Sequence, residues 1–246
     1  MKMTHRLLGF AGAGLLAACL VCPGCAPRQS APPAPAPIPA PVPAPAAPVM
    51  VAEVTAEPAP AQIRFKGQDV GVTPVSVSLA HLDEVTQLTA SLADQPLMET
   101  RIRFSDPDRV QIAYRFGGEP SPMAKALGLA RVLVFDYGDQ ATFDVDSADL
   151  KPEVRPLLER QAGLLNSHFP TLDVFVCGHT DSSGGEAHNL ELSLKRAQAV
   201  GLFLGDQSVG KTRIKIQGFG EGYPVGANDT PEGRARNRRT EIILPQ

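Results

Sequence analysis

Asp181 and Arg196 are the two residues of this chain whose types and spacing best fit a binding site for a charged ligand. They stand in the pattern GHTD-x7-N-x2-LS-x2-RA, which begins at Gly178 and includes Asn189. An aspartate is an acceptor-only anion, and an arginine presents a planar fork of donors that holds a carboxylate at two points. On residue types alone, a plain salt bridge between the two is the simpler interpretation. Placed around a ligand, the same two groups could recognise a centre that bears both an ammonium and a carboxylate.

The elements on either side of this pair predict how it is positioned. Residues 172–177 form a nearly continuous apolar run that predicts a strand, and residues 189–204 place apolar side chains on one face of a predicted helix. Asp181 follows the strand, at the edge where α/β folds usually present ligands. Arg196 lies about two turns into the helix. The loop 182–185, Ser-Ser-Gly-Gly, can bring the two side chains together.

A second block, Gly-Arg-Ala-Arg-Asn-Arg-Arg at 233–239, completes a resemblance to a known family. Together the two blocks resemble the peptidoglycan-binding domain of the OmpA-like family, which includes the peptidoglycan-associated lipoproteins. In that family the Asp of GHTD and the Arg of LS-x-x-RA hold the diaminopimelate of Gram-negative peptidoglycan. The resemblance covers residues 130–246, less than half of the chain, and implies the same role for Asp181 and Arg196.

Other positions of the family pattern match as well. Thr180 and Asn189 are expected to shape the loop and to cap the following helix. Asp146 stands where relatives contact the ligand, often with Asn, and this departure from the family pattern leaves its contact open. The resemblance therefore implies the following ligand-binding residues: Asp181, Arg196, Thr180, Asn189, Asp146, Asn237 and Arg238.

The N-terminus predicts export and lipidation. A positively charged start is followed by an apolar run, residues 7–18, that is too short to span a bilayer as a stable helix. The run ends in Leu-Ala-Ala before Cys19, which resembles the lipobox of bacterial lipoproteins and implies cleavage before Cys19 and acylation of that residue, palmitate being the expected chain. An ordinary secretory signal cut near Ala26 is the alternative. Leu20, in place of an Asp, favours the outer membrane over the inner membrane.

The remaining cysteines do not point to redox chemistry. Cys22 and Cys25 form a C-x-x-C beside the predicted anchor, without a βαβ pattern around it. A small disulfide loop or idle thiols are the simpler interpretations. Cys177 lies in an apolar run and is expected to be a buried small hydrophobe.

Composition divides the chain into segments. Residues 26–60 hold 12 of the 24 prolines, mostly alternating with alanine, and such a segment favours polyproline II over a packed core. We expect a disordered Pro/Ala linker that follows the anchor. The predicted organisation is a signal peptide (1–18), an anchor and linker (19–60), a small β module (61–117), a linker (118–129) and a C-terminal domain (130–246).

The predicted module at 61–117 alternates apolar and polar residues with the period of a strand. Its motif Gly67-x3-Gly71-x-Thr73-Pro74 resembles the PEGA-type β module of bacterial surface proteins. The glycines are expected to form a hairpin turn and Pro74 to end a pairing edge. No catalytic constellation is visible in this segment.

The C-terminal domain is predicted to be an α/β (α+β) sandwich with a β-α-β-α-β order and a mixed sheet. Phe143 and Val145 could continue its first strand, and Pro156 is expected to delay or kink its first helix. The predicted elements are a strand at 131–135, a helix at 152–167, a strand at 172–177, a helix at 189–204 and strands near 214–216 and 240–244.

Other chemistries fit these residues less well. The basic run 234–239 could suggest nucleic acid, but it leads into an alternating strand and the chain carries an export signal. His179, Asp181 and His188 lack the compact spacing of a metal site. The serines after Asp181 lie near His179 in sequence, but no oxyanion arrangement accompanies them. We expect no metal, no cofactor, no nucleic-acid partner and no enzymatic activity.

The expected function is that of an outer-membrane lipoprotein that faces the periplasm, binds peptidoglycan non-covalently through diaminopimelate and tethers the membrane to the wall. Its expected partners are peptidoglycan, the outer membrane through acylated Cys19, and other envelope proteins. Two alternatives stay open: an accessory wall-anchoring lipoprotein of a secretion or motility complex, and a wall hydrolase.

Overall fold

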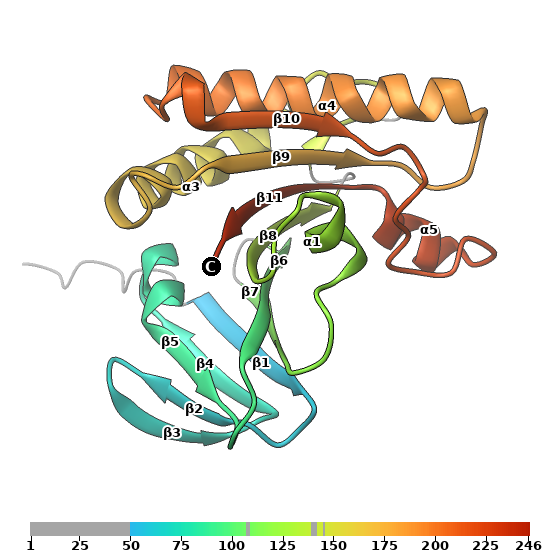
Figure 1. Cartoon of the computed structure of the whole chain (residues 1–246). Coiled ribbons are helices and arrows are strands. Elements are labelled where there is room, and N and C mark those ends of the chain that lie inside the picture. The colour runs from blue at the N-terminus through green and yellow to red at the C-terminus, as the bar shows by residue number, and fades with distance from the viewer. Residues whose placement is uncertain (1–49, 107–108, 139–141, 145) are drawn as a thin grey trace, which may run out of the picture. The chain divides into compact units, whose positions relative to one another are not determined.

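Alternating apolar residues build the strands of two sheets (Figure 1). In β7, for example, Val110, Ile112 and Tyr114 are buried while the residues between them face outward. The strands are β1 (Met50–Glu57), β2 (Gln62–Phe65), β3 (Gln68–Val72), β4 (Val75–Leu79), β5 (Leu88–Ser91), β6 (Leu97–Asp106), β7 (Arg109–Phe116), β8 (Val132–Gly138), β9 (Val174–His179), β10 (Ile214–Gly218) and β11 (Arg239–Pro245).

The helices occur mainly in the C-terminal half. The predicted delay of the first helix by Pro156 is confirmed. A 3-10 turn precedes α3, which begins at Arg155, so Pro156 lies in the first turn of α3, where a missing N–H is tolerated. The helices are α1 (Pro122–Ala126), α3 (Arg155–His168), α4 (Glu186–Asp206) and α5 (Pro231–Asn237), with 3-10 helices at Leu82–Gln87, Pro152–Val154 and Lys211–Arg213.

The computed structural model describes residues 50–246 apart from 107–108, 139–141 and 145. The predicted signal peptide, Cys19 and the first part of the Pro/Ala segment lie outside the described residues. Within the part that is described, no helix is long and apolar enough to cross a membrane.

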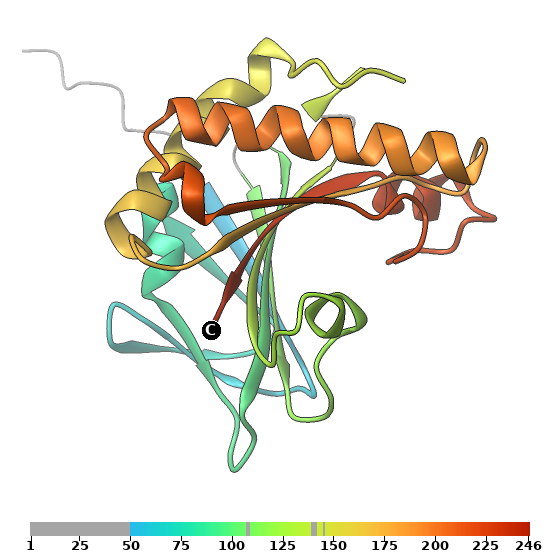
Figure 2. The same ribbon diagram turned by 45° about the horizontal axis from the view of Figure 1, so that its top comes forward.

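The larger sheet confirms the predicted α/β sandwich with a mixed sheet. Its eight strands lie in the order β10-β9-β11-β8-β6-β7-β1-β4, and α3 and α4 cover one of its faces (Figures 1 and 2). Strands β9 and β10 are parallel, while β11 runs antiparallel to β9 and β8. The smaller sheet has the order β3-β2-β5, and its first hairpin turns at Lys66 and Gly67, both of which have positive φ. The predicted role of Gly67 in a turn is thus confirmed.

The predicted linker is wrong at its C-terminal end, because residues 50–57 form β1. This strand lies between β4 and β7 and pairs in parallel with β7 from Val51 to Glu57. Met50, Ala52 and Val54 point into the core, whereas the residues between them are partly exposed. The alternation was hidden in the sequence by the prolines on either side of it.

The sheet crosses the predicted boundary between the β module and the C-terminal domain. Strand β6 pairs in parallel with β8, from Glu99 opposite Val132 to Phe104 opposite Tyr137. The segment 118–129, predicted as a linker that runs into a short helix or loop, contains the short helix α1, whose Met123 is buried against the sheet. All of the described residues therefore belong to one compact unit, because the hydrogen bonds of the sheet run through both parts.

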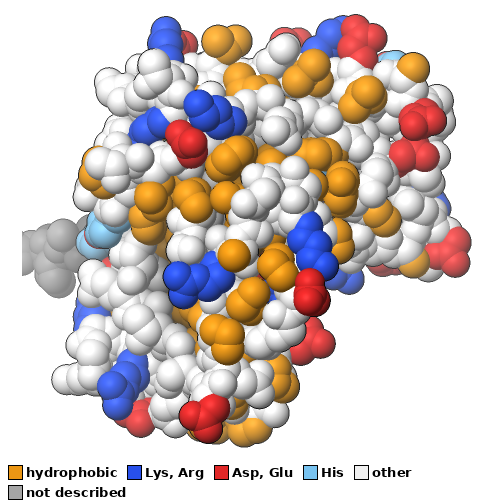
Figure 3. Space-filling model, viewed as in Figure 1, with side chains coloured by type: hydrophobic (Ala, Val, Ile, Leu, Met, Phe, Trp, Pro, Cys, Tyr) orange, Lys and Arg blue, Asp and Glu red, His pale blue; other side chains and the backbone are white. Residues whose placement is uncertain are grey.

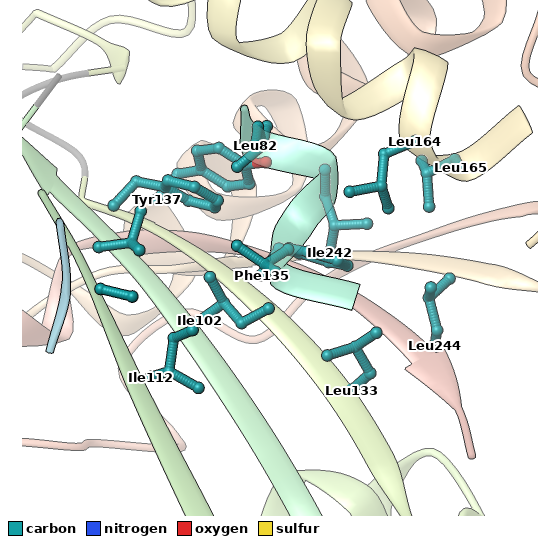
Figure 4. Close-up of a cluster of buried hydrophobic side chains, with 14 of the residues drawn as sticks. Leu82, Ile102, Ile112, Leu133, Phe135, Tyr137, Leu164, Leu165, Ile242 and Leu244 are labelled. Carbon is teal, nitrogen blue, oxygen red and sulfur yellow. The ribbon is translucent and has the colours of Figure 1, made fainter. Parts of the chain in front are cut away.

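The apolar core also joins the two parts (Figure 4). Leu82, from the 3-10 helix that follows β4, lies in the same cluster as Phe135 of β8 and Leu165 of α3. Phe104 of β6 stacks on Tyr137 of β8 with ring centroids 5.0 Å apart. Strand β8 is buried on both of its faces, which explains its almost uninterrupted apolar sequence.

The opposite face of the sheet carries a buried network of charges. Arg101 of β6 approaches Glu241 of β11 to 2.6 Å and Asp136 of β8 to 3.5 Å, and Arg239 lies 2.8 Å from the same glutamate. Burial alone would raise the pKa of Glu241, but the positive charges of Arg101 and Arg239 outweigh it and hold that pKa well below its ordinary value. The network thus links the N-terminal and C-terminal strands electrostatically.

One other local prediction needs correction, and one segment has structure that the sequence analysis did not describe. Phe143 does not continue β8; it forms an isolated bridge with Leu150 beyond the end of that strand, and Val145 lies outside the described residues. The basic run before β11 is helical at its start, because Thr230 caps α5 by accepting a hydrogen bond from the amide of Gly233.

Candidate functional site

The candidate site lies at the C-terminal end of β9, where the start of α4 and the end of α5 come to the same side (Figure 1). The first turn of α4 follows β9 after a short loop, and α5 leads into β11, which pairs with β9. The two sequence blocks that suggested a ligand site are therefore neighbours in space. Their side chains differ, however, in what they contact.

Asp181 is a buried carboxylate with a cation beside it. Its Oδ1 accepts a hydrogen bond from the amide of Ser183 at 2.8 Å, and its Oδ2 lies 2.5 Å from Nη1 of Arg238. Burial would raise the pKa of Asp181, but the bonds from Ser183 and Arg238 outweigh it and lower that pKa below its ordinary value. Asp181 is therefore ionised at neutral pH.

Arg196 is buried on the face of α4 that meets the segment 142–150. Its Nε donates to the carbonyl of Ser147 at 2.8 Å and its Nη2 to the carbonyl of Asp144 at 3.3 Å. The guanidinium also lies over the ring of Phe143, 5.2 Å from the centroid. Arg196 thus fixes the segment that carries Asp146, while the ion pair of Asp181 is with Arg238.

Asn189 and Thr180 do not cap α4, contrary to the prediction. The residue before the helix is Gly185, which has no side chain, and Asn189 lies inside the helix. Its Nδ2 donates to the carbonyl of Asp181 at 3.2 Å and to Oε2 of Glu221 at 2.7 Å, so it ties two loops together. The hydroxyl of Thr180 is buried and has no hydrogen-bond partner among the described residues.

Asn237 organises the loop before α5. Its Oδ1 accepts from the amides of Val225 and Gly226, both at 2.8 Å, and its Nδ2 donates to Oδ1 of Asn228 at 2.8 Å. Asn228 in turn accepts from the amide of Ser182, in the loop that follows Asp181. Asn237 and Arg238 were both predicted to be ligand-binding residues. Arg238 contacts Asp181 directly, whereas Asn237 holds the loop that precedes α5.

Asp146 is exposed and has a left-handed backbone conformation, with φ of 56°. Its carboxylate lies 2.9 Å from Nε2 of His188, at the start of α4. Sequence reasoning missed this pairing, and it also missed Glu221 as a partner of Asn189. The position of His188 immediately before the motif residue Asn189 could have indicated that His188 lies near the site.

Two glycines of the motif blocks are required by close packing. A Cβ on Gly178 would lie 2.0 Å from the carbonyl oxygen of Ser193, and a Cβ on Gly233 would lie 1.9 Å from that of Ala227. These contacts bring α4 against β9 and α5 against its preceding loop. They fix α4, which follows Asp181, and α5, which precedes Arg238.

Figure 3 shows acidic and basic side chains interspersed over the face that it presents. On the segment before α3, Lys151 pairs with Asp144 at 3.3 Å. No group of His, Cys, Asp and Glu in the described ranges is arranged to hold a metal ion.

Comparison with known proteins identifies the family. The model of the OmpA family matches residues 142–238, which include both motif blocks and the segment with Asp146. These residues form an OmpA family domain. The matched residues share their sheet with β1, β4, β6, β7 and β8, which precede the matched range, and with β11, which follows it.

Several relatives of the OmpA domain are named as an outer membrane protein, a lipoprotein or a peptidoglycan-binding protein. The chain is 38% identical over 137 residues to outer membrane protein A of Bordetella avium, and the match covers 56% of this chain and 66% of that protein. It is 41% identical over 112 residues to the probable lipoprotein YiaD of Escherichia coli (46% and 51%). It is 38% identical over 107 residues to the peptidoglycan-binding protein ArfA of Mycobacterium tuberculosis (44% and 32%). The matches thus span about a third to two thirds of the length of these relatives.

Among solved structures, the OmpA domain is similar to the peptidoglycan-associated lipoprotein of Burkholderia pseudomallei. The two are 32% identical, with 42% of this chain and 87% of that chain covered and a TM-score of 0.39.

Proposed function

We propose that this chain binds peptidoglycan non-covalently through the diaminopimelate of its stem peptides and, through acylated Cys19, tethers the outer membrane to the cell wall. The observation that carries the proposal is the charge arrangement at the end of β9. Asp181 is kept ionised in a buried position beside Arg238, and the buried guanidinium of Arg196 lies on the adjoining helix. Such an arrangement suits a centre that carries an ammonium and a carboxylate together.

Each charged group has a distinct part in this proposal. The carboxylate of Asp181 accepts the ligand's ammonium, because an ionised carboxylate offers acceptors only. Arg196 holds the ligand's carboxylate, since a guanidinium fork matches a carboxylate at two points. Arg238 keeps Asp181 charged and in place, and Asn189 fixes the loop that carries it.

The OmpA domain supports this reading, since its relatives include a protein named as peptidoglycan-binding and one named as a probable lipoprotein. Acylation of Cys19 and an outer-membrane location are parts of the proposal. Many anchored copies facing a polymeric wall would give avidity even where each site binds weakly.

We also propose that the site is a binding site and not a hydrolytic one. His179 is the histidine nearest in sequence to Ser182 and Ser183, but it is buried. Its ring stacks on Phe219 at 5.6 Å and lies 3.6 Å from Glu241. These contacts hold the ring in the interior, so it is poorly placed to act as a base for an exposed serine.

Co-sedimentation of the full chain with purified diaminopimelate-type sacculi tests the proposal. Asp181→Ala and Arg196→Lys are expected to lower the bound fraction at least tenfold, because the first removes the anion and the second removes the fork. Asp206→Ala, an exposed aspartate at the far end of α4, and Arg160→Lys, an exposed arginine of α3, serve as matched controls and should bind like wild type. Equal retention of wild type and both site variants would refute the assignment, and release of muropeptides would reveal a hydrolase.

A further inference from the structure

Strand β1 is the first element of the described part of the chain, and it lies inside the larger sheet. It pairs with β4 over five residues, from Met50 to Val54, and with β7 over seven, from Val51 to Glu57. At the ends of the described sheet, strands such as β10 have a neighbour on one side only. A tether attached before Met50 therefore enters the domain through a strand that is held on both sides.

The inward face of β1 is also anchored in the main core. Met50, Ala52 and Val54 are 8%, 0% and 1% exposed, and they belong to the same apolar cluster as Ile112 of β7 and Phe104 of β6. Movement of β1 along its axis would carry these side chains out of their places. A close-packed interior resists such displacement, because the gaps left behind lose their contacts.

A continuous series of strand pairs leads from β1 to the candidate site. Strand β7 pairs with β6, β6 with β8, β8 with β11, and β11 with β9, which is followed by Asp181. Arg101 of β6 forms ion pairs with Asp136 of β8 and Glu241 of β11, so charges reinforce the middle of this path. Tension between β1 and the site is thus carried by the sheet itself.

The direction of β1 decides how a pull acts on it. In Figures 1 and 2, β1 begins on the side of the molecule away from the end of β9. A pull on the chain before Met50, against a hold at Asp181, therefore draws β1 out by its first residue. Such a pull acts along the strand and loads the hydrogen bonds to β4 and β7 together, whereas a pull across the strand would break them one after another.

We propose that β1 bears the mechanical tension between a membrane anchor and the wall-binding site; this inference rests on the proposed function. It gives the strands before the OmpA domain a role that ligand binding alone does not require. Resistance to force depends on the rate of unfolding. Removing an interaction of β1 that breaks on the way to the transition state should therefore shorten the lifetime under tension.

Constant-force measurements on single molecules of the full chain test the proposal. One handle is attached at Ser183, an exposed residue of the loop after Asp181. The other is a short peptide tag placed either before Met1 or in the exposed turn at Ala93, since exposed turns tolerate insertions. The first tag position pulls on β1. The second applies the force between β5 and β6 and bypasses β1.

Two valine-to-alanine changes separate a role under tension from general stability. Val54 of β1 and Val200 of α4 are both 1% exposed, so each change removes the same atoms from the core. With the tag before Met1, Val54→Ala should shorten the lifetime under force about tenfold, whereas Val200→Ala should change it less than about twofold. With the tag at Ala93, Val54→Ala should also stay within about twofold of wild type.

The inference is overturned if Val54→Ala shortens the lifetime equally at both tag positions, or at neither. It is also overturned if Val200→Ala has as large an effect as Val54→Ala when the tag precedes Met1. These measurements involve no peptidoglycan, so a negative result refutes only the role of β1. Absence of sacculus binding in the co-sedimentation experiment would instead refute the proposed function.

Discussion

The carboxylate of Asp181 and the guanidinium of Arg238 meet at 2.5 Å and join the end of β9 to the residue that follows α5. The pair is largely buried, with 8% and 28% of the two side chains exposed. It depends on the antiparallel pairing of β9 and β11, which sets Arg239 opposite His179 and brings the neighbouring residues together. One ion pair therefore connects the two motif blocks of the OmpA domain.

Arg238→Gln should destabilise the protein in a pH-dependent way. The pKa of Asp181 is lowered in the folded state, so its contribution to stability is present above the ordinary aspartate pKa of about 4 and is lost as the pH falls below it. We expect a loss of about 1–2 kcal/mol at pH 6 that shrinks towards zero near pH 2. Urea denaturation of both proteins across this range measures the difference, and a difference independent of pH would contradict the ion-pair account.

Arg101→Met should be strongly destabilising, because it leaves Glu241 and Asp136 buried without one of their cations. The expected loss is about 3–5 kcal/mol, as for a broken buried ion pair. Arg109→Met is the matched control: Arg109 pairs with Glu53 at 3.2 Å, but both side chains are largely exposed, so the expected loss is below about 1 kcal/mol. Chemical denaturation that gave similar losses for both would show that the buried network contributes little.

The OmpA domain of this chain should not fold well without the strands that precede it. A fragment of residues 118–246 lacks β6, which pairs with the central strand β8, and it also lacks Arg101. It would expose the edge of a strand that is otherwise buried on both faces, which favours aggregation. Size-exclusion chromatography and amide hydrogen exchange test this; a monomeric fragment with a protected β8 would contradict it.

Gly178→Ala should be costly, whereas Gly163→Ala should be neutral or stabilising. The added Cβ at residue 178 would lie 2.0 Å from a backbone oxygen of α4, so the helix would have to shift away from β9 and from Asp181. Gly163 lies in α3 with nothing near its would-be Cβ, and replacing a helical glycine by alanine gains about 0.5–1 kcal/mol. Thermal unfolding of the two variants compares them directly. Equal stability would show that the sheet accommodates the helix shift.

The sequence by itself determined the parts that depend on local pattern. The apolar run at 172–177 and the helical periodicity at 189–204 correctly predicted β9 and α4, because a buried strand and an amphipathic helix each impose a period on their residues. The two motif blocks correctly predicted an OmpA domain that contains Asp181 and Arg238. The glycines of these blocks are required by close packing, and Asp181 and Arg238 are hydrogen-bonded to each other.

Only the tertiary structure decided which of these residues meet. The pairing of Asp181 with Arg238, of Arg196 with the carbonyls around Asp146, and of Asp146 with His188 depends on contacts between distant segments. The same holds for β1, whose short alternation is concealed among prolines and becomes a strand because β4 and β7 are there to pair with it. Strand pairing across long separations leaves no periodic trace in a single sequence, so a continuous sheet through β6 and β8 could not be predicted from it.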